Sequence, residues 1–196
     1  WHIKNLGSIL KIGSKAPDVF NFLQGSFVSR NLIGFERQPP LLQKKSLSDW
    51  WSACKTNNED CSTTVWVIVD IFTQYYDVSI GQDVLNLLKK CKVNIKVVFP
   101  KNSIVAMVSY GLLNEAKNEL KILHSQLNDA AKNDLIVGIE PSEVLVWRDE
   151  AKSLLNGRLP NVLLFEELLL ELDQLKVLPK FHALNTKVWV YEHCHQ

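Results

Sequence analysis

Residues 64–70, with the sequence TVWVIVD, decide the fold class of this chain. They form a continuous run of β-branched and aromatic residues, which is typical of a strand that is buried on both faces. The runs at 93–99 and 134–139 predict two further strands, and residues 186–191 (TKVWVY) predict a fourth. Strands of this kind are typical of parallel sheets that are covered by helices on each side.

Apolar residues recur at helical spacing between these runs. The spacing predicts helices over 79–91 and 112–131, from Pro141 to about Leu155, and over 161–173. Strands that alternate with helices indicate an α/β fold with a parallel four-stranded sheet and helices on both faces. We assign residues 64–196 to this domain.

Residues 1–63 differ from the rest, because they hold four of the eight glycines and three of the seven prolines. Short helices are predicted over 15–23 and 46–54, the second with Ser46 or Ser48 as its cap. We interpret the region as an irregular N-terminal arm or linker. Two alternatives stay open: an arm that wraps another surface, or a layer that packs on its own domain.

Charge and composition exclude several classes of protein. The 196 residues hold 22 Lys and Arg against 21 Asp and Glu, so the chain lacks the basic excess of a nucleic-acid-binding protein. The apolar runs are far shorter than the ~20 residues that span a bilayer, so no transmembrane segment is expected. We interpret the start at Trp1 and the end at Gln196 as cuts through a longer protein.

The cysteines form no recognisable framework. They lie at positions 54, 61, 91 and 194, with wide gaps and no CxxC pair. This spacing predicts neither a set of disulfides nor a closed zinc site.

Ligands of parallel sheets bind beyond the carboxyl ends of the strands, so those ends are the places to look for a site. Asn102 and Ser103 follow the second strand, where they can bond turn backbone or cap the next helix. Glu140 and Glu143 follow the third strand; they favour a helix start, with an acid/base pair as the alternative. The chain has no glycine-rich phosphate loop, which removes the usual reason to propose a nucleotide.

Two more strand ends carry candidate site residues. Residues 70–76 hold aromatic side chains that either line a cofactor pocket or pack on the next helix. Cys194 lies between His193 and His195, where a thiol and imidazoles can ligate a metal or lower the thiol pKa. An extended segment would point the two histidines to opposite sides, so one metal would not take both. The alternative is a solvated chain end.

These strand-end segments resemble the cysteine-rich (CCG) domain of FAD-linked oxidoreductases, found in the iron–sulfur subunits of glycolate and lactate oxidases and in heterodisulfide reductase. The resemblance covers about residues 35–196. Residues 69–76 (VDIFTQYY), 109–116 (SYGLLNEA) and 138–142 (GIEPS) with 148–150 (RDE) are similar to VDTFTNYF, SKGLLDEA and GLEPSC…RDE of the family. Residues 190–196 (VYEHCHQ) are similar to VHGHCHQ, which opens the second copy of the family's repeat.

The resemblance implies an electron-transfer domain whose strand-end cysteines hold a 4Fe–4S cluster. It also implies a partner domain or subunit with FAD, and a 2-hydroxy acid such as lactate or glycolate as the substrate class. The implied location is the cytoplasm, or a peripheral position on the inner face of the membrane.

The chain departs from the family at the cluster positions. The family's Cys-Cys-Gly falls on Asn102, Ser103 and Ile104, and its next cysteine falls on Glu143. Only Cys194 is retained, with His193 as a weaker candidate metal ligand. Asn, Ser and Glu are poor ligands for soft metals, and a cubane cluster normally needs four thiolates. We therefore expect a degenerate first copy that binds no cofactor in this chain.

The leading hypothesis is a fragment of an FAD-linked oxidoreductase that acts with a flavin domain and is not catalytic in isolation. In this hypothesis the chain is the electron-transfer region with most cluster cysteines lost. One alternative is a non-catalytic docking module with no redox centre. Another is a small-molecule binding domain that uses a cleft beside Ser103 and His193.

Overall fold

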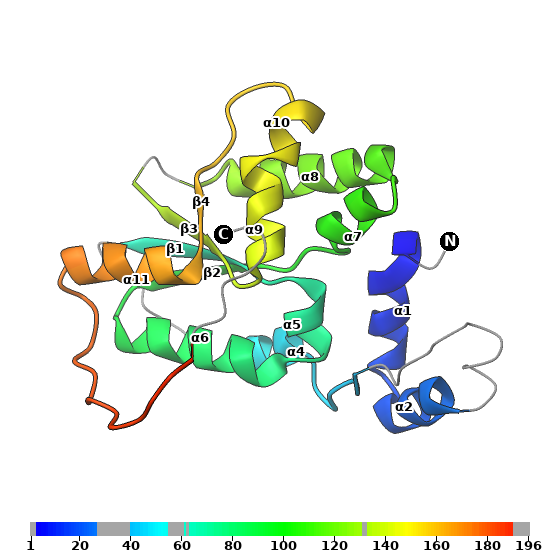
Figure 1. The fold of residues 1–196 in the computed structure, drawn as a ribbon, viewed down its shortest axis with the longest axis horizontal. Coiled ribbons are helices and arrows are strands. Elements are labelled where there is room, and N and C mark those ends of the chain that lie inside the picture. Colours follow the sequence, from blue (N-terminus) through cyan, green and yellow to red (C-terminus); the bar gives the residue numbers. More distant parts are fainter. Residues whose placement is uncertain (1–2, 27–39, 55–60, 62, 131–132, 190–196) are drawn as a thin grey trace.

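The structure is a computed structural model, which describes residues 3–26, 40–54, 61, 63–130 and 133–189. Its centre is an all-parallel sheet of four strands in the order β2-β1-β3-β4 (Figure 1). The strands are β1 (Thr64–Ile68), β2 (Asn94–Val98), β3 (Leu135–Gly138) and β4 (Val162–Leu163). The predicted fold class, an α/β fold with a parallel four-stranded sheet, is confirmed.

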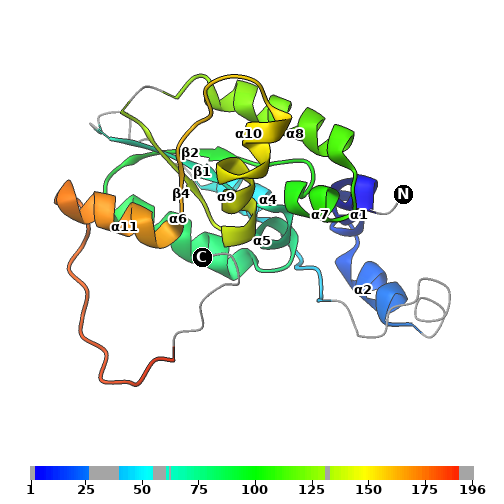
Figure 2. The same cartoon turned by 45° about the horizontal axis from the view of Figure 1, so that its top comes forward.

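Helices cover both faces of this sheet, as Figures 1 and 2 show. One face packs against α4 (Leu47–Ala53), α6 (Val78–Lys90) and α11 (Phe165–Gln174). The other packs against α7 (Ile104–Ser109), α8 (Leu113–Leu127), α9 (Pro141–Arg148) and α10 (Glu150–Leu154). The remaining described helices are the short 3-10 helix η1 (Ile3–Asn5), α1 (Leu6–Gly13), α2 (Pro17–Gly25) and α5 (Ile71–Tyr75).

The burial of β1 on both faces of the sheet explains why residues 64–70 predicted a strand so clearly. Successive side chains of a strand point to opposite faces, so Val65 and Val67 enter one core while Trp66 and Ile68 enter the other. All four are buried. The one polar group among them, the Trp66 Nε1–H, donates to Asp134 Oδ2 at 2.8 Å.

The predicted position of the fourth strand is wrong. The fourth strand is β4, which pairs Val162 and Leu163 with β3, inside the segment predicted to be entirely helical. Residues 186–189 pair with no described strand, and Trp189 is 92% exposed; residues 190 and 191 lie outside the described residues. The leucine-rich pattern concealed a two-residue strand that precedes α11.

Arg148 fixes β4 in place, which the sequence did not indicate. Its Nε and Nη2 donate to the Val162 carbonyl at 3.3 and 3.0 Å, and its guanidinium also pairs with Glu167 on α11. The helix predicted from Pro141 to Leu155 is divided at Asp149, whose φ of −115° and ψ of −76° depart from helical values.

The N-terminal region is more regular than expected. Ser46, one of the two residues predicted to cap α4, accepts a hydrogen bond from the Asp49 N–H at 3.2 Å. Leu10 of α1 is buried with Leu42 and with Ile71 of α5. Helix α1 therefore packs on its own domain, which is the second of the two alternatives for this region. None of the described helices is long and apolar enough to cross a membrane.

Candidate functional site

Three of the helices that start at the carboxyl edge of the sheet are each capped by a side chain from a strand end. Asp70 caps α5 by accepting from the Phe72 and Thr73 N–H groups at 2.9 Å. Ser103 caps α7 by accepting from the Ala106 N–H at 3.1 Å. Glu140 caps α9 and also accepts from the Ser142 hydroxyl at 2.7 Å. Caps of this kind satisfy helix N–H groups that have no intrahelical partner.

Ser103 and Glu143, two of the predicted site residues, are in direct contact. The Ser103 hydroxyl donates to Glu143 Oε1, and Glu143 Oε2 accepts from the Ile104 and Val105 N–H groups at 3.2 and 3.4 Å. One carboxylate of α9 therefore holds the first turn of α7. The contact joins the strand ends of β2 and β3 across the carboxyl edge.

Burial makes Glu143 the most perturbed acid at this edge. Loss of solvent raises the pKa of its carboxyl from 4.5 to about 7, although the Ser103 hydroxyl opposes the shift. Burial also raises the pKa of Asp70, against the hydrogen bonds from Thr73 and Phe72. The two acids line one small cavity of about 10 Å³ together with Glu140. That space holds about one water molecule and no cofactor.

Asn102, the third predicted residue in the described part, has different partners. Its side chain is buried, and its Oδ1 accepts from the Gly7 N–H of α1 at 3.1 Å. Its own N–H and that of Lys101 donate to buried Glu119 of α8 at 3.2 and 2.8 Å. The loop after β2 is therefore held from both sides, by α8 and by α1.

Helix α1 lies directly on this loop. A Cβ atom at Gly7 would lie 1.7 Å from the Lys101 carbonyl oxygen, so the position accepts only glycine without a backbone shift. Lys4 adds an ion pair to Glu115 at 2.9 Å. The carboxyl end of β2 is thus covered by the N-terminal region.

The donor set at this edge does not fit an iron–sulfur cluster. The described ligand positions carry amide, hydroxyl and carboxylate oxygens, which are already hydrogen-bonded to each other or to the main chain. No three His, Cys, Asp or Glu side chains of the described residues group as metal ligands. Cys91 is buried at the end of α6, and burial raises its pKa. Cys194 and His193 lie outside the described residues.

The segment 70–76 forms the helix α5 and its flanks, and Tyr75 does not pack on the next helix as one interpretation expected. This ring is buried against α1. Phe72 and Tyr76 stack on each other with ring centroids 6.5 Å apart. Neither ring lines the small cavity between Asp70, Glu140 and Glu143.

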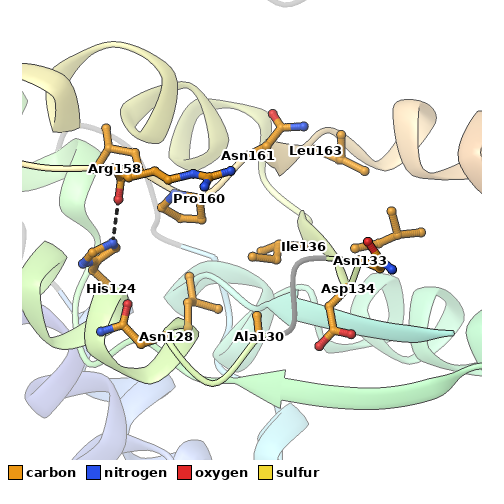
Figure 3. Close-up of a pocket in the computed structure, with 13 residues that line it drawn as sticks. His124, Asn128, Ala130, Asn133, Asp134, Ile136, Arg158, Pro160, Asn161 and Leu163 are labelled. Carbon is orange, nitrogen blue, oxygen red and sulfur yellow. Dashed lines mark hydrogen bonds between the residues drawn. The ribbon is translucent and has the colours of Figure 1, made fainter.

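A larger hollow lies at the opposite, amino edge of the sheet (Figure 3). Its volume is about 690 Å³, and it lies between the end of α8 and the segment that leads into β4. His124 Nε2 hydrogen-bonds to the Arg158 carbonyl at 3.1 Å across one side of it. Ile136 of β3 lies between these walls. Sequence reasoning missed the hollow, because its residues come from three segments, 124–130, 133–136 and 158–163, with no shared motif.

Comparison with known proteins gives one informative match. No protein-family model matches the chain, and no solved structure matches it. The chain is 31% identical over 167 residues to the D-2-hydroxyglutarate dehydrogenase of Escherichia coli (strain K12). The chain is a homologue of part of this enzyme.

The match covers only a small part of the E. coli dehydrogenase, so the activity of that enzyme does not transfer directly to this chain. The match takes in 76% of this chain but only 16% of the E. coli dehydrogenase, so the chain spans about one sixth of the length of that relative. The match supports the oxidoreductase relationship that the strand-end motifs indicated. The activity of the whole E. coli dehydrogenase concerns a protein much longer than the region that is shared.

Proposed function

We propose that this chain is a non-catalytic region of an FAD-linked 2-hydroxy-acid dehydrogenase, and that it carries no iron–sulfur cluster. The relationship to D-2-hydroxyglutarate dehydrogenase supports the class of enzyme. The single observation that carries the loss of the cluster is the hydrogen bond between Ser103 and Glu143. Two positions that correspond to family ligands are engaged with each other instead of presenting thiolates.

The leading hypothesis from the sequence is an electron-transfer region, and one alternative is a docking module. The geometry favours the docking module. An electron carrier needs a redox centre, and the oxygen donors at this edge are poor ligands for an iron–sulfur cluster. The proposed partner is the flavin-bearing part of the same oxidoreductase, which supplies hydride or electron chemistry when FAD is bound. A cytoplasmic or peripheral membrane location is part of the same proposal.

Co-expression tests this proposal. The probe is the E. coli D-2-hydroxyglutarate dehydrogenase from which the segment that matches this chain has been deleted. We expect this chain to co-purify with the truncated enzyme and to raise its yield of flavin-loaded, soluble protein. No co-purification and no gain in flavin-loaded protein would contradict the proposed function.

A further inference from the structure

Helix α2 exposes its apolar face to solvent and buries a polar residue, Gln24. Val19, Phe22 and Leu23 are spaced at i, i+3 and i+4, so they share one face. All three are exposed, and Phe22 is 76% exposed. A short helix that turns its apolar stripe toward solvent indicates an interaction surface, because such patches are rare on monomeric proteins.

The inner face of α2 is held by polar side chains. The Asn21 side chain accepts from the Leu42 N–H at 2.8 Å and donates to the Leu42 carbonyl at 3.0 Å. Gln24 is 9% exposed and donates to the Pro40 carbonyl at 2.8 Å. These bonds fix the orientation of α2, so the apolar side cannot turn inward without breaking them.

Two neighbouring segments also carry exposed apolar side chains. Leu41 lies on the segment that Asn21 and Gln24 hold, and Ile12 lies near the end of α1, which packs on α2 through Gly13 and Phe20. Both side chains are exposed. We call this set the α2 face; it comprises Ile12, Val19, Phe22, Leu23 and Leu41. Figures 1 and 2 show α2 at the periphery, away from the sheet.

The charge around the α2 face is strongly asymmetric. The described residues 3–26 and 40–45 hold five lysines and one acid, Asp18, whereas the whole chain has a net charge of +1. Lys11, Lys15, Lys44 and Lys45 are exposed, and Lys44 lies 3.6 Å from Asp18. A complementary surface is therefore apolar at its centre and acidic at its rim.

The same charges argue against two other occupants. A second copy would bring the lysines of both chains together, because a two-fold interface sets the same patch against itself. An anionic lipid surface would attract the lysines but would repel the Asp18 carboxylate that lies beside them. A protein surface can supply both hydrogen bonds and charges of either sign.

We propose that the α2 face is the surface on which the flavin-bearing part of the oxidoreductase docks, through a partner face that is apolar at its centre and acidic at its rim. This inference rests on the proposed function, since it names the contact that a docking module needs. The relative is about six times longer than the region it shares with this chain, so such a partner surface is available in an enzyme of this kind.

The experiment adds variants to the co-expression described above. Phe22→Ser combined with Leu23→Ser is expected to weaken co-purification with the truncated E. coli dehydrogenase by about tenfold or more. Ile80→Ser combined with Leu170→Ser is the matched control, because both residues are exposed apolar side chains outside the α2 face. The control is expected to bind as the unchanged chain does.

A second pair of variants tests the charge. Lys11→Glu combined with Lys44→Glu is expected to weaken the complex about tenfold at low salt, and the difference is expected to shrink as salt rises. Lys121→Glu combined with Lys152→Glu, exposed lysines on α8 and α10, is the control. Circular dichroism of each purified variant verifies that the fold is retained.

The outcomes separate this inference from the proposed function. If the unchanged chain binds and the α2-face variants bind equally well, the docking surface lies elsewhere and only this inference fails. If the unchanged chain does not bind, both fail. Self-association or binding to phosphatidylglycerol vesicles that the Phe22 and Leu23 variant abolishes, without binding to the truncated enzyme, would also overturn it.

Discussion

The two edges of the sheet differ in how their polar groups are used. At the carboxyl edge, Ser103 and Glu143 bond each other, and Asn102 bonds Gly7 of α1. At the amino edge, a hollow of about 690 Å³ remains between α8 and the segment before β4. The edge where parallel sheets usually bind ligands is therefore the one that this chain has filled.

Under the proposed function, positions that hold cluster ligands in the CCG family carry hydrogen-bonded oxygen donors in this chain. The residues that follow β2 and β3 still meet, as ligands of one centre would. The oxygen donors at these positions hydrogen-bond to each other and to the main chain, so side chains hold this edge together. The predictions below test whether the carboxyl edge is closed and the amino edge is not.

The largest effect is expected at Gly7. In Gly7→Ala, the added Cβ would overlap the Lys101 carbonyl oxygen, so α1 must shift from the carboxyl edge. We expect a loss of about 3 kcal/mol or more in the free energy of unfolding, measured by denaturant titration. Alanine has a higher helix propensity than glycine. A loss of stability in Gly7→Ala would therefore come from the overlap with the Lys101 carbonyl and not from a weaker helix.

Ser8→Ala in the next position is the control for Gly7→Ala, and we expect it to be nearly neutral. Amide hydrogen exchange at residues 100–103 should accelerate in the Gly7 variant alone. Equal stability of Gly7→Ala and the unchanged chain would mean that α1 does not cover the end of β2.

The second effect concerns pH and Glu143. Burial raises its pKa in the folded state to about 7, so the folded state holds this proton more tightly than the unfolded state does. The resulting stability is present at pH values below the unfolded pKa and is lost as pH rises toward 7. We expect up to about 3 kcal/mol of such loss between pH 4 and pH 8.

Glu143→Gln isolates this contribution, because glutamine keeps an oxygen acceptor without the charge. Thermal unfolding measured across this pH range should show a flatter profile for the variant than for the unchanged chain. Glu150→Gln, on α10, is the control and should leave the profile unchanged. Parallel profiles for Glu143→Gln and the unchanged chain would contradict the assignment.

A smaller effect is expected at Arg148, which joins β4 to α9 and α11. Arg148→Ala removes its hydrogen bonds to the Val162 carbonyl and its partly exposed pairing with Glu167. We expect a loss of about 1 to 2 kcal/mol, with faster amide exchange at the β3–β4 pairing. Lys152→Ala is the control, and protection that persists in the Arg148 variant would show that β4 is held by other contacts.

The smallest effect is expected at the amino edge. The Arg158 guanidinium makes no hydrogen bond or ion pair with another residue in the described part of the chain. We expect Arg158→Ala to change stability by less than about 0.5 kcal/mol in chemical denaturation. A loss as large as that at Gly7 would remove the contrast between the two edges.

The sequence predicted the strands whose signal is local and missed features that depend on distant partners. The sequence predicted β1 because the side chains of residues 65–70 are all buried. Residues 186–191 have the same composition, yet residues 186–189 form no strand here, since strand composition does not supply a pairing partner. Val162 and Leu163 pair because β3 and Arg148 lie beside them, which no local pattern encodes.

The candidate site was partly predictable for a similar reason. Topology places the ends of β2 and β3 at one edge, so the fold class predicts Ser103 and Glu143 at that edge but not the hydrogen bond between them. The contact between Gly7 and Asn102 did not, because it joins residues 95 positions apart. The outward apolar face of α2 was also missed, because nothing local shows that Val19, Phe22 and Leu23 point to solvent.

Anaerobic reconstitution of the purified chain with iron and sulfide tests the central claim most directly. The readouts are bound iron per chain and the broad visible absorption of a cubane cluster. A variant with Asn102→Cys, Ser103→Cys and Glu143→Cys, which restores thiols at the family positions, serves as the comparison. We predict that the unchanged chain retains no more than trace iron after desalting, and a 4Fe–4S cluster at near-stoichiometric occupancy in it would contradict this account.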